Sequence, residues 1–108
     1  MNLPTEIFDD VVVVHTPEEL GTDQVDEFEA FISTLEHTQI VFDLDHTELL
    51  DSDGLTSILD TYDAMRERNG DVKLTTTNVS NRKILEITQI DRQVEVFDSV
   101  IDAVSSFR

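Results

Sequence analysis

Two carboxylates and one hydroxyl that could take part in phosphate chemistry lie close together in "VFDLDHTELLDSDGL", residues 41–55. Asp43 and Asp45 belong to or follow an apolar run. Two carboxylates at the end of a strand can divide the work of phosphoryl transfer, because one attacks phosphorus and the other protonates the leaving group. Ser52 lies in the acidic stretch "DSDG", where its hydroxyl could accept a phosphate or cap a helix. The segment is therefore a candidate catalytic loop, phosphorylation site or helix start.

Other chemically active residues are few. The three histidines, His15, His37 and His46, lack the spacing of metal ligands, and each is expected at the surface or in a loop. The absence of cysteine excludes disulfides, thiolate zinc sites and thiol nucleophiles. Ser52 lacks the context of a nucleophile elbow, and the sequence contains no glycine-rich phosphate loop. The sequence thus predicts no metal site and no cofactor.

Negative charge is concentrated in the first part of the chain. The 108 residues carry 24 Asp and Glu against seven Lys and Arg, a net charge of −17, and residues 1–65 contain no Lys or Arg. Nucleic acids and anionic membranes require basic patches, so direct binding to either is not expected, whereas a basic protein partner fits. Adaptation to a saline habitat is the other explanation of the acidity.

The length bounds the organisation of the chain. We expect residues 1–108 to form one domain that is large enough to bury a hydrophobic core. The start "MNLPTEIFDD" has neither the basic nor the apolar region of a signal peptide. No apolar stretch reaches the roughly 20 residues of a membrane helix. A cytoplasmic location is expected.

Strand and helix patterns alternate along the chain. Strands are expected in "DDVVVVHT", "QIVFDL", "DVKLTTT" and "VEVF", residues 9–16, 39–44, 71–77 and 94–97, with a short paired segment near residues 6–8. Helical patterns lie between and after them. Strands that alternate with helices form mostly parallel sheets. The predicted fold is therefore α/β, with four or five mostly parallel strands, a short antiparallel edge and about four helices.

Each expected helix has a capping candidate, and most have a clear inward face. The expected caps are Thr22 or Asp23 for the first helix, Ser52 or Asp53 for the second, Ser80 for the third and Asp98 or Ser99 for the fourth, and "NG" at 69–70 is expected to end the second. The predicted inward residues are Val25, Phe28, Phe31, Ile32 and Leu35 in the first helix, Leu55, Ile58, Leu59, Tyr62 and Met65 in the second, and Val100, Ile101, Val104 and Phe107 in the fourth. Functional loops of such sheets follow the carboxyl ends of strands, and residues 45–54 form such a loop.

Several pieces of the chain resemble, in order, the STAS domain, the family of bacterial anti-sigma-factor antagonists and of the cytoplasmic tails of sulfate transporters. The pieces are "IVFDL", "LLDSDGL", "RNGDVKLTTTNVSNRKILEITQID" and "VEVFDSVIDAV". The resemblance runs from about Val11 to Phe107. Its most specific part is the helix-entry motif, typically Asp-Ser-Ser-Gly-Leu or Asp-Ser-Thr-Gly-Leu. Gln89 stands where the family often has a glycine after the third helix.

The resemblance implies a switch and not an enzyme. In regulatory members, a kinase that is also an anti-sigma factor phosphorylates the hydroxyl residue before the glycine. The unmodified form binds the kinase and frees the sigma factor, and a serine phosphatase resets the switch. A phosphate adds roughly −1.5 to −2 charge at a helix start that must dock on a partner. The implied role is a protein–protein interaction module in bacterial transcription regulation, whose partner is an anti-sigma factor and serine kinase or a related regulator.

The phosphorylated position of the family holds Asp53 in this chain. Its carboxylate carries a permanent negative charge, about half that of a phosphate. Asp53 either mimics the phosphorylated state or marks a surface that has lost its switch. Ser52 aligns with the first Ser of the motif and is the candidate for phosphorylation, followed by Thr56. The expected partner-binding surface comprises Asp45, His46, Asp51, Ser52, Asp53, Gly54, Leu55 and Thr56.

The same segment also resembles the first motif of haloacid-dehalogenase-type phosphohydrolases, Asp-x-Asp-Gly-Thr after an apolar strand. Asp43 would be the nucleophile and Asp45 the general acid and base, both near Mg²⁺, with Thr47 completing the motif. His46 replaces the glycine, the motif comes late in the chain, and a downstream pair of acids is missing. Lys83 alone is a weak match for the phosphate-binding lysine. These departures argue against phosphohydrolase activity.

Three classes of function therefore remain distinguishable. A partner-switching module predicts that Asp53→Ser restores phosphorylation by a kinase-like anti-sigma factor. A constitutive STAS accessory subunit of a transport or signalling complex predicts a membrane-complex partner and no such effect. A phosphohydrolase predicts Mg²⁺-dependent turnover that Asp43→Asn abolishes.

Overall fold

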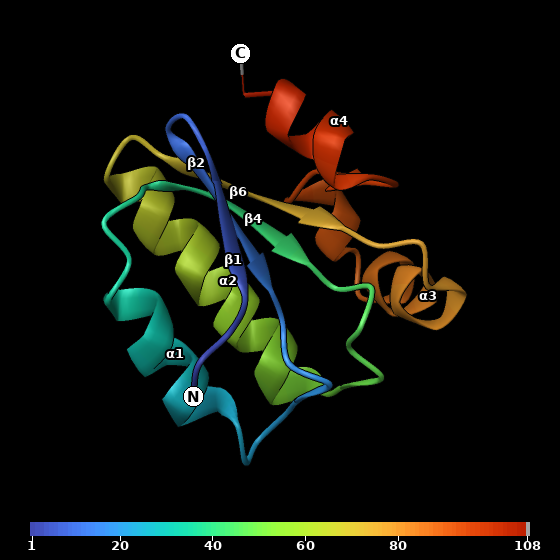
Figure 1. Ribbon diagram of the computed structural model, residues 1–108. Coiled ribbons are helices and arrows are strands. Elements are labelled where there is room, and N and C mark those ends of the chain that lie inside the picture. The colour runs from blue at the N-terminus through green and yellow to red at the C-terminus, as the bar shows by residue number, and fades with distance from the viewer. Residues whose placement is uncertain (108) are drawn as a thin grey trace.

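The computed structural model describes residues 1–107 as a sheet flanked by helices (Figure 1). The elements are β1 (Thr5–Phe8), β2 (Val11–His15), β3 (Glu19–Leu20), α1 (Val25–Ser33), β4 (Gln39–Asp43), β5 (Leu49–Leu50), α2 (Ser52–Glu67), β6 (Asp71–Thr75), α3 (Val79–Ile87), the 3-10 helix η1 (Ile90–Arg92), β7 (Val96–Phe97) and α4 (Val100–Ser105). The α/β class and the mostly parallel sheet confirm the fold predicted from sequence. Within the described residues, no helix has the length and apolar character needed to cross a membrane.

The main sheet has five strands in the order β1-β2-β4-β6-β7. β1 runs antiparallel to β2 and forms one edge, whereas the other neighbouring pairs are parallel. The central strands end in register, with His15 beside Asp43 and Asp43 beside Thr75. Three loops therefore leave the same edge of the sheet. β3 and β5 form a separate parallel ribbon that the sequence patterns did not predict.

Both faces of the sheet carry buried apolar side chains. Successive residues of a strand point to opposite faces, so β2 and β4 each contribute side chains to both. Val12 and Phe42 belong to a core shared with α1, α2 and α3. Phe42 meets Phe28 of α1, with 5.4 Å between their ring centroids. Val13 and Val41 point the other way and pack with α4. Figure 1 shows α1 and α2 together on one side of the sheet and α4 on the other.

The inward faces predicted for the first two helices are confirmed, since all ten residues are buried or half-buried. The face predicted for the fourth helix is partly wrong. Ile101 is 75% exposed. α4 instead buries Ala103, flanked by the half-buried Val100 and Val104. Ile101 follows Val100 by one residue, which turns its side chain about 100° away from that stripe.

The caps of α1 and α4 differ in how well sequence predicted them. The residue before α1 is Gln24, whose side chain makes no capping hydrogen bond. The prediction of Thr22 or Asp23 was wrong because these residues lie in the turn that precedes the helix. At α4, Ser99 accepts a hydrogen bond from the Asp102 N–H, as predicted.

The cap of α3 lies two residues earlier than predicted. The Asn78 side chain accepts a hydrogen bond from the Asn81 N–H, with 3.1 Å between Oδ1 and N. Ser80 lies inside the first turn and is exposed, so its prediction as the cap was wrong. Asn is as good a cap as Ser, and Asn78 stands three residues before the N–H that it holds.

Two helices end at residues in the left-handed conformation. Asn69 has φ 63° after α2, and the Gly70 N–H bonds the Met65 carbonyl at 2.7 Å, which confirms "NG" as the helix end. Gln89, with φ 62°, follows α3. The turn that the family often makes with glycine is thus kept here by a residue with a Cβ atom.

Candidate functional site

α2 begins at Asp51, which caps it. The Asp51 Oδ1 accepts a hydrogen bond from the Gly54 N–H at 3.0 Å, and the backbone of Asp51 is extended as a cap requires. The prediction that Ser52 or Asp53 caps this helix was wrong. Both lie inside the first turn, where their side chains are exposed. They are therefore available for a role other than capping.

Thr22 joins the two carboxylates at the start of α2. The Thr22 N–H donates to Asp51 Oδ2 at 3.0 Å, and the Thr22 hydroxyl donates to Asp53 Oδ2 at 2.6 Å. The N–H groups of Gly54 and then Thr22 lower the pKa of Asp51 below its ordinary value of 3.8. The turn after β3 thus fixes both carboxylates. Sequence analysis missed Thr22 as a site residue because the short β3–β5 ribbon that brings it there has no clear sequence signal.

Gly54 allows α2 to start close to β3. A Cβ atom at this position would collide with the carbonyl oxygen of Leu20. The next residue, Leu55, is 7% exposed and belongs to the core. The glycine and leucine of "DSDGL" therefore dock the helix, while Ser52 and Asp53 face solvent.

The two candidate phosphorylation sites differ in what their hydroxyls do. Both Ser52 and Thr56 are exposed. The Thr56 hydroxyl donates to the Ser52 carbonyl at 2.9 Å within the helix. Within residues 1–107 the Ser52 hydroxyl has no hydrogen-bond partner. The Ser52 hydroxyl is thus the more open of the two, and phosphorylation of either residue stays a prediction.

Asp45 and His46 lie in the loop between β4 and β5. Asp45 Oδ1 accepts hydrogen bonds from both the N–H and the hydroxyl of Thr77, which follows β6. The Asp45 carboxylate is thus tied to the β6–α3 loop, while His46 is exposed. Of the predicted surface, the structure brings Asp51 to Thr56 together on one helix start.

The buried side-chain amide of Asn81 binds the backbone of the loop between β4 and β5. Asn81 of α3 is 1% exposed, and its Nδ2 donates to the Leu44 carbonyl at 3.1 Å and to the Thr47 carbonyl at 2.8 Å. Sequence analysis did not identify Asn81, because a polar residue in an amphipathic helix usually faces solvent. Its contacts fix the path of the chain from β4 towards β5 and α2.

Asp43 lies at the end of β4 and is 6% exposed. Its Oδ1 accepts from the Asp45 N–H at 3.1 Å and the Thr75 hydroxyl at 3.3 Å, and its Oδ2 lies 2.8 Å from His15 Nδ1. His15 Nε2 lies 2.7 Å from Glu6 Oε1. The expectation that His15 is a surface or loop residue was wrong, because it is a half-buried strand residue between two carboxylates.

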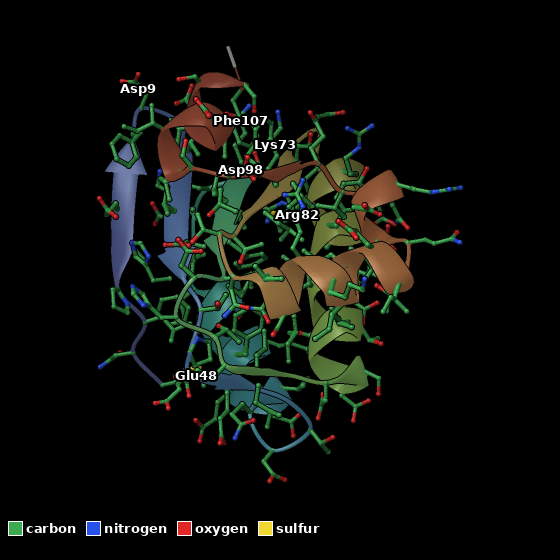
Figure 2. All side chains as sticks on the ribbon, turned by 90° about the vertical axis from the view of Figure 1, so that its right-hand side faces the viewer. Asp9, Glu48, Lys73, Arg82, Asp98 and Phe107 are labelled. Atoms are coloured by element: carbon green, nitrogen blue, oxygen red, sulfur yellow. The ribbon has the colours of Figure 1, made fainter. Side chains whose placement is uncertain are left out.

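The other residues of the phosphohydrolase motif are arranged differently from what that chemistry needs. Thr47 is fully buried, and its hydroxyl donates to the Pro17 carbonyl at 2.6 Å. Lys83 borders a groove together with Arg82 and Asp98, which Figure 2 labels. Asp43 does not line this groove. Within residues 1–107, no group of three or more His, Asp or Glu side chains is placed to hold a metal ion.

The surface around the start of α2 is acidic and contains one apolar side chain. Leu49 of β5 is 52% exposed and lies beside Glu19 of β3 in the ribbon. Glu48 and Asp53 are also exposed, and Figure 2 shows Glu48 at the end of the molecule away from α4. Leu49 is thus an exposed apolar side chain with the carboxylates of Glu19 and Glu48 on neighbouring residues.

Comparison with known proteins places the chain in a family. The model of the STAS domain matches residues 2–103. A protein of Thermotoga maritima described as an anti-sigma factor antagonist is 25% identical over an alignment of 109 positions, which covers 97% of this chain and 96% of that protein. A crystal structure of an anti-sigma factor antagonist from Thermotoga maritima, also 25% identical, has a TM-score of 0.89 over 96% of this chain and 92% of that chain.

More distant structures share the fold. An anti-sigma factor antagonist from Mycobacterium paratuberculosis is 22% identical, with a TM-score of 0.86 over 97% of this chain and 92% of that one. The Bacillus cell fate determinant SpoIIAA in its phosphorylated form is 20% identical, with a TM-score of 0.73 over 99% of this chain and 100% of that one. The resemblance seen in the sequence is confirmed: the chain belongs to the STAS domain family and has the fold of its anti-sigma factor antagonists.

Proposed function

We propose that this protein is a non-catalytic binding module of a bacterial partner-switching pathway, in which Asp53 supplies a permanent negative charge where switching relatives carry a hydroxyl. The observation that carries the proposal is the exposed Asp53 carboxylate, one residue before Gly54 in the first turn of α2. The similarity to anti-sigma factor antagonists supports an anti-sigma factor and serine kinase, or a related regulator, as the partner. SpoIIAA in its phosphorylated form is an example of this fold carrying added charge.

The local structure supports a fixed signal at Asp53. A helix N-terminus tolerates negative charge because the first N–H groups of the helix point towards it. Thr22 holds the Asp53 carboxylate through a 2.6 Å hydrogen bond, so the charge has a defined position. A partner that recognises an unmodified hydroxyl at this place meets a carboxylate instead. The protein then behaves as one locked in the phosphorylated state, or binds a partner that prefers the charge.

The acidic surroundings of the site bear on the partner. Asp53, Glu48 and Glu19 are exposed on adjoining segments, and the whole chain carries a charge of −17. A basic partner surface would be attracted to this side of the molecule, and its association rate would fall as salt increases.

A hydrolytic role for Asp43 has less support. A nucleophilic carboxylate must reach the phosphorus atom, but Asp43 is 6% exposed, and hydrogen-bonding groups of Asp45, Thr75 and His15 already occupy both of its oxygens. These contacts fit a structural role at the end of β4.

The test is a pull-down from lysate of the native host with three baits: wild type, Asp53→Ser and Asp63→Ser. Asp63 is an exposed acid of the same helix and lies away from its start. Asp63→Ser therefore removes the same charge as Asp53→Ser but leaves the helix start unchanged. Captured proteins are identified by mass spectrometry, and phosphate is read from the intact mass of each bait. We expect Asp53→Ser to gain a kinase partner or a phosphate that wild type and Asp63→Ser lack.

Two other results would decide against the proposal. If all three baits recover the same partner and none gains phosphate, Asp53 is not a fixed signal, and the surface is a constitutive binding site. If that shared partner is a membrane transport complex, the accessory-subunit hypothesis takes its place.

A further inference from the structure

A row of polar side chains crosses four neighbouring strands on the face of the sheet that α4 covers in part. It consists of Glu6 of β1, His15 of β2, Asp43 of β4 and Thr75 of β6. His15, Asp43 and Thr75 are in register, and Glu6 pairs with Val13 two residues before His15. The exposed fraction of the side chain falls along the row, from 53% for Glu6 to 22% for His15 and 8% for Asp43.

The imidazole of His15 lies between two carboxylates. Nδ1 is 2.8 Å from Asp43 Oδ2, and Nε2 is 2.7 Å from Glu6 Oε1. Ionised carboxylates only accept hydrogen bonds, and a neutral imidazole has a single N–H to donate. Both contacts are therefore satisfied at once only by the doubly protonated ring. The geometry thus selects the imidazolium form of His15.

The charged groups that act on the His15 ring come from the strands on either side of β2. Partial burial lowers the pKa of His15, but the hydrogen bonds and charges of Glu6 on β1 and Asp43 on β4 outweigh it. The net result is a pKa raised above the ordinary value of 6.5. Protonated His15 contributes its full stabilisation below the pKa that His15 has in the unfolded chain. This stabilisation is lost as pH rises through the higher pKa of His15 in the folded protein.

We propose that His15 is a proton-operated latch that holds the edge strand β1 against the sheet. When pH rises, one proton leaves Nε2 for solvent, and the remaining N–H stays on Nδ1. This tautomer is favoured because Asp43 is buried, so the loss of a donor costs more there than at the exposed Glu6. Glu6 then faces a lone pair and turns towards water.

β1 depends on this contact more than the other strands of the main sheet do. All four of its residues are exposed, so the strand packs little apolar surface. It is held by its ladder to β2, continued by the hydrogen bond from the His15 N–H to the Pro4 carbonyl at 3.0 Å. Loss of the Glu6–His15 ion pair therefore favours local opening of β1 while the parallel strands stay closed.

The latch is tested on the full chain by two NMR measurements, without any partner, so its outcome is independent of the proposed function. The first is the protonation of the two ring nitrogens from about pH 5.5 to about pH 8.5, the range in which histidines titrate. The second is the hydrogen-exchange protection factor of amides in β1 and β2, compared with those shared by β4 and β6. We expect both ring nitrogens to carry protons at low pH and only Nδ1 at high pH. Opening of β1 should increase about tenfold for each pKa unit that the latch adds.

Two variants separate a latch from a histidine that merely fills space. In Glu6→Gln, the amide can donate to a neutral Nε2, so we expect the pKa of His15 to fall and the pH step in β1 protection to disappear. In Glu67→Gln, which removes an exposed carboxylate at the end of α2, the step should persist. The proposal is overturned if β1 protection in wild type is independent of pH, if the step survives in Glu6→Gln, or if the single remaining proton resides on Nε2.

Discussion

The Thr22 hydroxyl donates a hydrogen bond to the Asp53 carboxylate, with 2.6 Å between Oγ1 and Oδ2, while the Thr22 N–H donates to Asp51. One turn residue after β3 thus positions both carboxylates at the start of α2. Asp51 in addition holds the Gly54 N–H. The two acids therefore have separate roles: Asp51 stabilises the helix start, and Asp53 presents charge to solvent.

This division predicts unequal effects of alanine substitution. Asp51→Ala removes acceptors from two backbone N–H groups, those of Gly54 and Thr22, and should lower the thermal unfolding midpoint clearly. Ser52→Ala and Asp53→Ala lack this effect and should stay near wild type. Thermal denaturation followed by circular dichroism measures all three. If the unfolding midpoint of Asp53→Ala is as low as that of Asp51→Ala, the result would contradict the assignment of Asp51 as the capping residue.

The charge of Asp51 also predicts a pH dependence. Hydrogen bonds from the Gly54 and Thr22 N–H groups lower the pKa of Asp51 below 3.8 in the folded state. Ionised Asp51 therefore contributes stability above the pKa of the unfolded chain's Asp51, and this stability is lost as pH falls through the lower folded pKa. Asp51→Asn keeps a capping oxygen but not the charge. Wild type should therefore be more stable than Asp51→Asn at about pH 7, and the difference should shrink towards about pH 3. A difference that stays constant over this range would contradict the charge as its cause.

Gly54 should resist replacement more than any neighbour in the motif. In Gly54→Ala, the new methyl group collides with the Leu20 carbonyl oxygen, so α2 must move away from β3. We expect a loss of about 3 kcal/mol in the free energy of unfolding, at the upper end of overpacking effects. Urea denaturation measures it, with Ser52→Ala as the control at an exposed position of the same turn. Equal stability of the two variants would show that the helix start has room for a side chain.

The repeating patterns were the part of the sequence that predicted the structure well. The strand Val11–His15 was indicated by a run of β-branched residues, and the inward face of α2 by apolar residues at a period of 3.6, so many side chains contributed to each prediction. The STAS resemblance added the connection between motif and helix start. The strands, the helix face and the family resemblance each depend on many residues, so one unusual residue changes the prediction little.

Features that depend on one residue were predicted less well. Asp51, Ser52 and Asp53 are all good caps, and only the three-dimensional path of the turn selects Asp51. The choice of Asn78 over Ser80 at α3 has the same origin. Contacts between distant segments, such as those of His15 with Glu6 and Asp43, leave no local pattern. They arise from strand order, which places residues far apart in sequence side by side.

Gln89 offers a stabilising substitution. Its φ of 62° lies in the left-handed region, which costs a residue with a Cβ atom roughly 1 kcal/mol and costs glycine little. Gln89→Gly should raise the free energy of unfolding by about 0.5 kcal/mol, since the greater entropy of glycine in the unfolded chain offsets part of the gain. Gln93, with φ −101°, is the matched control, and Gln93→Gly should destabilise. If both variants lose stability equally, the left-handed turn carries no strain.

Lys73 anchors α4 on the sheet. Its Nζ donates to Ser106 Oγ at 2.6 Å and lies 4.4 Å from the centroid of the Phe107 ring, and Figure 2 shows Lys73 and Phe107 close together. Lys73→Met keeps most of the buried stem but loses these contacts, together with the ion pair to Glu95 at 3.4 Å, so we expect a loss of about 2 kcal/mol. Lys83→Met, at an exposed position, should change stability by less than about 0.5 kcal/mol. Urea denaturation of both variants decides, and a Lys73→Met variant as stable as wild type would contradict the anchor.

Asn81 links α3 to the loop that leads into α2. Asn81→Ala leaves the carbonyl groups of Leu44 and Thr47 without their buried donor, which should cost about 2 kcal/mol in the free energy of unfolding. Asn81→Asp should cost more, because a carboxylate oxygen then faces two carbonyl oxygens. Ser80→Ala is the control, since Ser80 is exposed in the same turn.

Hydrogen exchange distinguishes the loop from the rest of the fold in these variants. If Asn81 holds the chain between β4 and α2, amides in residues 44–51 should lose protection in Asn81→Ala before those of the central strands. The proposed partner-binding surface would then be disordered although Asp53 itself is unchanged, and affinity for a partner that binds there should fall with loop protection. A uniform loss of protection over the whole sheet would instead make Asn81 a general core residue with no particular influence on this surface.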